Sequence, residues 1–185
     1  MSINPSIFKA YDIRGIYPED LNEEVIYLIG RAMAVLTGAK TVVVGHDARV
    51  SSDSLVSSLE KGILEQGASA VDIGLATTPM LNFAVAEYKE HEAGIMVTAS
   101  HNPKDYNGLK LCYENALPIG ENTGMADLKK LVMEGKFPAA PAGKMMKKEI
   151  LDAYVGKVLS LIDVKKIKPL KVVVDTANAV GAVPL

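Results

Sequence analysis

One short loop carries the residue types that phosphoryl chemistry uses. Residues 98–103 read Thr-Ala-Ser-His-Asn-Pro, and we call them the serine loop; Ser100 is the candidate phosphate carrier. A serine hydroxyl is a weak nucleophile unless a neighbouring group activates it. His101 is its immediate neighbour, too close in sequence for the usual Ser–His hydrogen bond to be assumed. Taken alone, the loop favours a serine that caps a turn before Asn102 and Pro103, and only the neighbouring residues shift the interpretation towards phosphoryl chemistry.

Two cations elsewhere in the sequence suit a phosphate on this serine. Lys110 lies in an alternating segment, so its side chain points away from the face of Leu109 and Leu111. Arg14 precedes a glycine near the start of the chain. A phosphoserine carries about −1.5 to −2 charges, which need cationic partners. Lys110, Arg14 and a metal ion could supply them, and phosphoryl transfer depends mostly on such positioning and charge stabilisation.

The elements that must position these residues alternate between strand and helix. Apolar residues at helical spacing predict helices over 21–36, 55–64, 79–88 and 149–162. Short β-branched runs predict strands over 41–45, 70–74, 94–97 and 171–175. Asp20 and Glu23 predict a capping box at the first helix, and Gly38 predicts its end. The segment 108–113 predicts an antiparallel strand at the sheet edge.

This order predicts an α/β fold with three layers, in which helices flank a mostly parallel, mixed sheet. In such sheets ligands bind outside the carboxyl ends of the strands, where residues 45–49 and the serine loop follow their strands. The Pro- and Ala-rich stretch 138–143 predicts a linker. We therefore expect a first domain over residues 1–140. Residues 141–185 are expected to form a linker helix and the truncated start of a second, similar α/β domain.

Composition excludes several classes of protein. The 185 residues carry a net charge of −2, without the basic excess of a nucleic-acid binder. No apolar run is long enough to span a bilayer, and the first residues lack the pattern of a secretory signal. The single cysteine, Cys112, excludes an internal disulfide and is interpreted as a small buried hydrophobe. We expect a cytoplasmic protein with no nucleic-acid or membrane partner.

Four motifs in a fixed order carry a family resemblance. Residues 8–15 read Phe-Lys-Ala-Tyr-Asp-Ile-Arg-Gly, residues 45–49 read Gly-His-Asp-Ala-Arg, the serine loop follows, and residues 106–110 read Tyr-Asn-Gly-Leu-Lys. Together they resemble the N-terminal part of the α-D-phosphohexomutases, in the phosphomannomutase/phosphoglucomutase branch, over essentially the whole chain. Phosphoglucosamine mutase is the alternative branch. Its serine loop usually begins Ser-Ala-Ser and its first motif usually reads Gly-Thr-Asp-Gly-Ile-Arg-Gly, so both motifs favour mannose or glucose phosphates.

The resemblance implies an isomerase that works through a phosphoserine. Ser100 gives its phosphate to the free hydroxyl of a hexose monophosphate, and a 1,6-bisphosphate forms, turns around and returns the other phosphate. The substrates are mannose or glucose 1- and 6-phosphates. The resemblance also implies that Mg²⁺ bridges the phosphate of Ser100 and an Asp-rich loop of the second domain. Ser100 would therefore be a metal ligand through its phosphate.

The same resemblance assigns roles to the matching residues. Arg14 and Lys110 act near the transferring group, and Lys110 is the candidate general acid/base. His101 contacts substrate or assists proton transfer. The predicted substrate-binding residues are Tyr11, which lines the sugar site, together with Asn102 and Arg49. For Arg49 and Asp47, bracing of the serine loop is as good an interpretation as direct contact with phosphate.

Two expectations limit this function. An Asp-Gly-Asp-x-Asp loop does not occur in the sequence. We therefore expect the chain to need the remaining domains of a longer parent and to show little or no turnover alone. The competing hypothesis is a non-catalytic module of the same fold that binds a phosphosugar or regulates a partner. A hydrolase is disfavoured, because the Gly-x-Ser-x-Gly nucleophile elbow is missing from the sequence.

Overall fold

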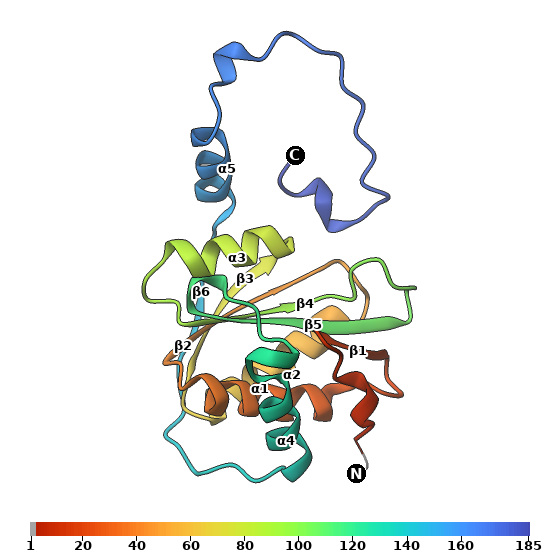
Figure 1. Cartoon of the computed structure of the whole chain (residues 1–185), viewed down its shortest axis with the longest axis vertical. Helices are drawn as coiled ribbons and strands as arrows, with labels where there is room; N and C mark the ends of the chain where they lie inside the picture. The colour runs from red at the N-terminus through yellow and green to blue at the C-terminus, as the bar shows by residue number, and fades with distance from the viewer. Residues whose placement is uncertain (1–2) are drawn as a thin grey trace.

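A single mixed sheet forms the centre of the computed structural model, which describes residues 3–185 (Figure 1). Its strands lie in the order β1-β5-β4-β2-β3-β6. Their bounds are β1 Ile13–Ile16, β2 Thr41–His46, β3 Ser69–Leu75, β4 Ala93–Val97, β5 Tyr106–Tyr113 and β6 Met145–Lys147. Strands β2, β3, β4 and β6 pair in parallel, whereas β5 is antiparallel to both β4 and β1. The predicted fold class is confirmed.

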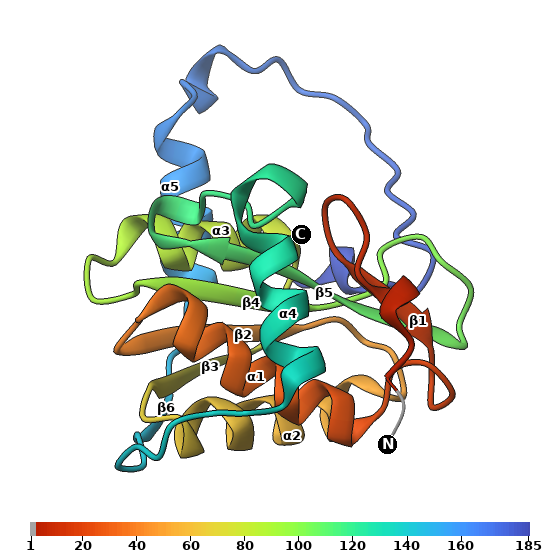
Figure 2. The same cartoon turned by 60° about the horizontal axis from the view of Figure 1, so that its bottom comes forward.

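Helices cover both faces of this sheet (Figures 1 and 2). The helices α1 (Glu23–Thr37), α2 (Ser52–Glu65) and α4 (Ala126–Glu134) form one layer; α3 (Thr78–Glu87) forms the other, with α5 (Leu151–Ser160) on its outer side. Short helical turns are η1 Pro5–Ile7, η2 Glu114–Ala116, η3 Glu121–Met125, η4 Val164–Lys166 and η5 Val180–Ala182. Within residues 3–185, no helix has the length and apolar character needed to cross a bilayer.

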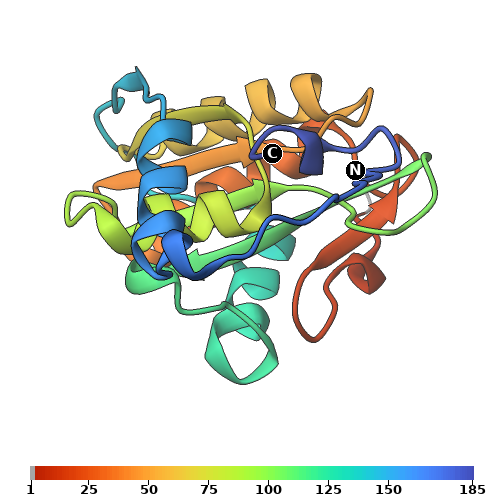
Figure 3. The same ribbon diagram turned by 90° about the horizontal axis from the view of Figure 1, so that it is seen from above.

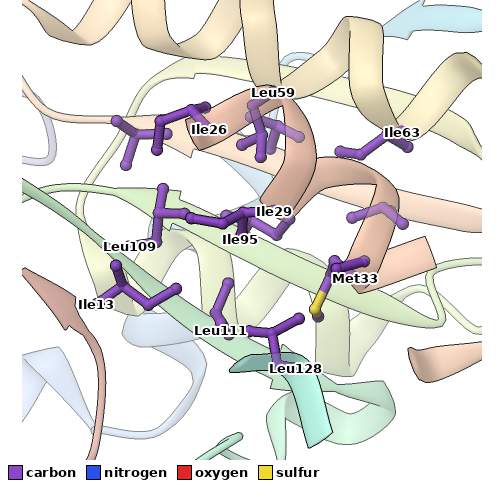
Figure 4. Close-up of a cluster of buried hydrophobic side chains, with 14 of the residues drawn as sticks. Ile13, Ile26, Ile29, Met33, Leu59, Ile63, Ile95, Leu109, Leu111 and Leu128 are labelled. Atoms are coloured by element: carbon purple, nitrogen blue, oxygen red, sulfur yellow. The ribbon is translucent and has the colours of Figure 1, made fainter. Parts of the chain in front are cut away.

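The strands build two cores because successive side chains point to opposite faces. Val42 and Val44 of β2 belong to the core under α1, α2 and α4, whereas Val43 between them belongs to the core under α3. Figure 4 shows the larger core, where Ile29 of α1 lies over Ile95 of β4. Burial on both faces explains why the parallel strands appear in the sequence as unbroken apolar runs.

The start of α1 differs from the prediction. Asn22 is the N-cap, and its side-chain oxygen accepts a hydrogen bond from Val25 N at 3.1 Å. Asp20 lies two residues earlier and instead accepts from Ile16 N and from the side chain of Asn4. The capping box predicted at Asp20 and Glu23 is therefore wrong. The predicted end is confirmed, since Gly38 adopts a left-handed φ of 62°.

The edges of the sheet also differ from the prediction. The antiparallel segment is β5, but it lies inside the sheet because β1 pairs along its outer side, with Ile13 opposite Leu109. Four residues with alternating burial gave too short a pattern for β1 to be predicted. At the other edge β6 pairs with β3, with Ala70 opposite Met145. After the predicted linker the chain thus adds a further strand to the same sheet. The domain boundary at residue 140 stays a prediction.

The predicted strand over residues 171–175 is wrong. These residues have no regular secondary structure, and Val173 is 91% exposed. β-branched residues favour an extended backbone, but a strand also needs a neighbour that satisfies its backbone groups. None of the described residues pairs with this segment. From above, the segment passes over the molecule as an open loop (Figure 3).

Close packing of α1 against α2 depends on two glycines, and Gly62 provides a test. A Cβ on Gly62 would overlap the backbone oxygen of Tyr27, and one on Gly30 would overlap that of Leu59. Gly→Ala within a helix normally stabilises by about 1 kcal/mol. We predict the opposite sign for Gly62→Ala, a loss of about 1–3 kcal/mol in the free energy of unfolding measured with urea.

Gly156→Ala in α5 is the matched control, because a Cβ there meets nothing within 4 Å. It should leave stability unchanged or slightly raised. If Gly62→Ala is as harmless as Gly156→Ala, the helices are not in the close contact described.

Candidate active site

The loops after β2 and β4 meet at the carboxyl edge of the sheet, where parallel topology predicts a ligand site. Asp47 follows β2, and its backbone N–H donates to Val97 O at the end of β4 over 3.0 Å. The neighbouring Thr98 donates its hydroxyl to Asp47 Oδ2 over 2.7 Å. The sheet therefore fixes the start of the serine loop directly against the loop after β2.

Asp47 is the buried centre of this arrangement. Its carboxylate accepts hydrogen bonds from Thr98, from the hydroxyl of Ser52 at 2.8 Å, and from both the backbone N and Nε of Arg49. A buried carboxylate is stable only when it is paired and hydrogen-bonded, and this one is satisfied four times. Asp47 thereby fixes the direction of the Arg49 side chain.

Arg49 in turn holds the backbone of the serine loop. Its Nη2 donates to Ser100 O at 3.1 Å and to Asn102 O at 2.7 Å, and its Nη1 donates to Pro103 O at 2.6 Å and to Tyr106 O at 2.9 Å. With Nε on Asp47, all five N–H groups of the guanidinium are in use within the chain. The geometry supports bracing by Arg49, the alternative to its predicted contact with substrate.

Ser100 lies at the exposed tip of this braced loop. Its backbone adopts a left-handed φ of 54°, which is uncommon for a residue with a side chain and concentrates at functional sites. The Ser100 N–H donates to Thr98 Oγ1 at 2.9 Å. The side chain lines a cavity of about 690 Å³ with His101, Asn102 and Lys104, and Ala177–Val180 from the C-terminal segment contribute to its wall.

The two predicted cations reach this edge from the neighbouring strands. In the β1–β5 pair, Arg14 lies opposite Gly108, so that Arg14 and Lys110 are diagonal neighbours on one face. Arg14 Nη1 donates to Asn102 Oδ1 at 2.8 Å, which ties β1 to the serine loop. Asn102 is predicted to bind substrate; in this structure its side-chain oxygen positions Arg14.

Asp12 joins the two cations, and sequence reasoning missed it. Its Oδ2 accepts from Arg14 Nε at 2.8 Å and lies 3.8 Å from Lys110 Nζ. The motif at residues 8–15 contains Asp12 two positions before Arg14, but only the strand pairing brings Lys110 to it. Thr98 was likewise visible only as a motif member, because its contact with Asp47 joins loops 51 residues apart.

Tyr11 and Lys110 line an adjoining cavity of about 300 Å³. Tyr11 is 83% exposed, and Thr78 at the start of α3 lines both cavities. Cys112 lies at the wall of the smaller cavity, where burial raises the pKa of its thiol to about 12. It therefore stays a protonated, buried thiol, as the sequence predicted, and is no candidate nucleophile.

The described residues do not form a cation site by themselves. Among residues 3–185, no three His, Cys, Asp or Glu side chains group as metal ligands. The carboxylate of Asp47 is occupied by donors from Thr98, Ser52 and Arg49. The arrangement instead offers an exposed hydroxyl on a rigid loop with an arginine and a lysine on the adjacent strands. That combination suits a serine that carries an anionic group.

Comparison with known proteins gives a consistent result. Residues 5–138 match the family model described as phosphoglucomutase/phosphomannomutase, alpha/beta/alpha domain I. A phosphomannomutase of Salmonella montevideo is 42% identical over 178 residues, covering 95% of this chain and 39% of that protein. A phosphomannomutase of Vibrio cholerae is 40% identical over 177 residues, covering 92% of this chain and 38% of that protein. The chain thus spans less than half the length of these relatives.

A solved structure shares both fold and sequence with the chain. A phosphoglucomutase/phosphomannomutase family protein from Burkholderia thailandensis superposes with a TM-score of 0.78 at 34% identity. The match covers 88% of this chain and 37% of that one.

Replacement of Arg49 tests its bracing role. Arg49→Lys keeps the charge, but an ammonium has three donors without the planar fork and cannot serve four carbonyls and Asp47 together. We predict that the variant loses about 1–3 kcal/mol of unfolding free energy. We also predict faster amide hydrogen exchange at Asn102 and Tyr106, whose N–H groups close the loop turns.

Arg31→Lys is the control of the same type, since Arg31 lies on α1 over the ring of Phe137. It should leave exchange at Asn102 and Tyr106 unchanged. Unaltered exchange at these amides in Arg49→Lys would show that the loop does not depend on this guanidinium.

Proposed function

Because the chain belongs to the phosphoglucomutase/phosphomannomutase family, we propose that it supplies the phosphoserine-bearing domain of a phosphohexomutase. The observation that best supports this function is the position of Ser100. It lies at the exposed tip of a loop that Arg49 braces through four carbonyls. Arg14 is hydrogen-bonded to the same loop through Asn102.

The proposed reaction moves a phosphoryl group from Ser100 to sugar and back. The free hydroxyl oxygen of a hexose monophosphate attacks the phosphorus of phosphoserine, and the bond from phosphorus to Ser100 Oγ breaks. The product is a hexose 1,6-bisphosphate. A base takes the proton of the sugar hydroxyl and Ser100 Oγ takes up a proton as it leaves phosphorus, so the transfer neither gains nor loses a proton. After the bisphosphate turns around, Ser100 Oγ attacks its other phosphoryl group, and the isomeric monophosphate is released.

This chain contributes position and charge to that transfer. Lys110 is our candidate for moving the hydroxyl proton, and Arg14 for holding the phosphoryl oxygens. His101 lines the larger cavity with Ser100, which supports its proposed contact with substrate. Tyr11 lines the smaller cavity with Lys110, which supports its proposed place beside the sugar. Thr78 lines both cavities, which supports a hexose phosphate that contacts both sets of residues.

Members of this family generally use Mg²⁺, which supplies positive charge to the transferring phosphoryl group. Of the residues that surround the serine loop, Ser100 would provide a ligand only through its phosphate. We propose that the remaining ligands come from further domains of a longer protein, and we derive no step from the metal. For the same reason we propose little turnover by the 185 residues alone. We keep mannose or glucose phosphates as the proposed substrates and the cytoplasm as the proposed location.

A mass measurement tests the phosphoserine. The longer protein in which we propose that this chain operates should gain one phosphoryl group when incubated with glucose 1,6-bisphosphate and Mg²⁺. Peptide mapping should place that group on Ser100. Ser100→Ala should abolish both the adduct and the conversion of mannose 1-phosphate to 6-phosphate, a loss of at least about 10³-fold.

Ser57→Ala is the control, since Ser57 lies on the exposed side of α2 and donates to Asp53 O in its own helix. It should keep both adduct and activity. Binding of the bisphosphate without any adduct on Ser100 would favour the non-catalytic phosphosugar-binding module instead.

A further inference from the structure

The carboxylate of Asp12 lies where two cations of the candidate site meet. Its Oδ2 is 2.8 Å from Arg14 Nε and 3.8 Å from Lys110 Nζ. The side chains of Asp12 and Arg14 are only 15% and 12% exposed, so water screens this pair less than a surface pair. The Lys110 side chain is 35% exposed. The arginine is therefore held tightly and the lysine loosely by the same oxygen.

Arg14 has a second anchor that Lys110 lacks. Its Nη1 donates to Asn102 Oδ1 at 2.8 Å, so the guanidinium is fixed at two points by Asp12 and the serine loop. The only ion-pair partner of Lys110 among the described residues is Asp12, at a distance beyond a normal hydrogen bond. A flexible four-carbon stem lets its ammonium exchange one anion for another. The two cations thus differ in freedom although they share one counter-ion.

We propose that Asp12 is a positioning residue that fixes Arg14 and competes with an incoming phosphate for Lys110. This proposal rests on the proposed function in one respect: the proposed function identifies the incoming anion as a phosphoryl group. Asp12 gives the pair of cations a counter-ion from within the chain, which keeps the paired lysine and arginine from repelling one another. A phosphate at the serine loop must draw Lys110 from Asp12, whereas Arg14 keeps its orientation.

The proposal predicts an unusual sign for a charge-neutralising substitution. Asp12→Asn keeps an oxygen that can accept from Arg14 Nε but removes the negative charge that attracts Lys110 and repels phosphate. Inorganic phosphate should therefore bind the 185-residue chain about fivefold more tightly in Asp12→Asn than in the unchanged protein. The dissociation constant can be measured by NMR titration of the serine-loop amides with inorganic phosphate. A residue that only maintained the loop would give weaker binding when replaced.

A double-mutant cycle assigns the gain to Lys110. In a Lys110→Met background, Asp12→Asn should improve phosphate binding less than twofold, because there is no longer a lysine for which Asp12 and phosphate compete. Glu87→Gln removes the same charge at the far end of α3, where Glu87 pairs with Lys157, and should leave phosphate binding unchanged. Unchanged or weaker binding in Asp12→Asn, equal gains with and without Lys110, or no phosphate binding to either protein overturns the proposal.

These outcomes are separate from those of the proposed function. The phosphate titration needs no covalent step, so it can succeed although no adduct forms on Ser100. A phosphoryl adduct on Ser100 would support the proposed function. If the dissociation constant for inorganic phosphate were nevertheless unchanged in Asp12→Asn, the proposed role of Asp12 would be wrong.

Discussion

The ion pair between Asp47 and Arg49 is the interaction on which the site depends. Asp47 is buried at the end of β2 and accepts from Thr98 as well as from Arg49, so one carboxylate links two loops. Arg49 then satisfies four backbone carbonyls between residues 100 and 106. Without this pair those carbonyls would need water, and the left-handed Ser100 would lose its support. The exposed hydroxyl is thus held in place by groups whose donors and acceptors are already paired within the chain.

The order of the strands supplies the second constraint. Because β5 runs antiparallel to both β4 and β1, the start of β5 lies beside the ends of β4 and β1, although β1 is far from the other two in sequence. Gly108 lies between Thr98 and Arg14 at this point: its C=O accepts from Thr98 N at 2.9 Å, its N–H donates to Asn107 Oδ1 at 2.8 Å, and Arg14 lies opposite it on β1. Lys110, two residues further along β5, falls on the same face as Arg14. If β5 ran parallel to β4 and β1, Lys110 and Arg14 would no longer be neighbours on one face of the sheet.

Sequence reasoning predicted the layers, because apolar periodicity is local. It also predicted that the loops after β2 and β4 meet at the carboxyl edge of the sheet, because that rule follows from topology. It placed most helices and strands near their observed bounds, while the roles of Ser100, Arg14 and Lys110 stay predictions. It missed β1 and β6, whose four and three residues carry too little pattern. It also predicted a strand at Val173, which pairs with no strand within residues 3–185. The roles of Asp12, Asn102 and Arg49 depend on contacts between residues that are 51 to 98 positions apart in the sequence. Rules based on local residue spacing cannot predict such contacts.

A crystal structure of the chain with phosphoserine incorporated at position 100 would test the account most directly. We expect the phosphoryl oxygens to lie within hydrogen-bond distance of Lys110 Nζ and of Arg14, with the Arg49 hydrogen bonds to the loop carbonyls unchanged. A phosphate that points into solvent while Lys110 stays on Asp12, or a loop that leaves Arg49, would contradict it.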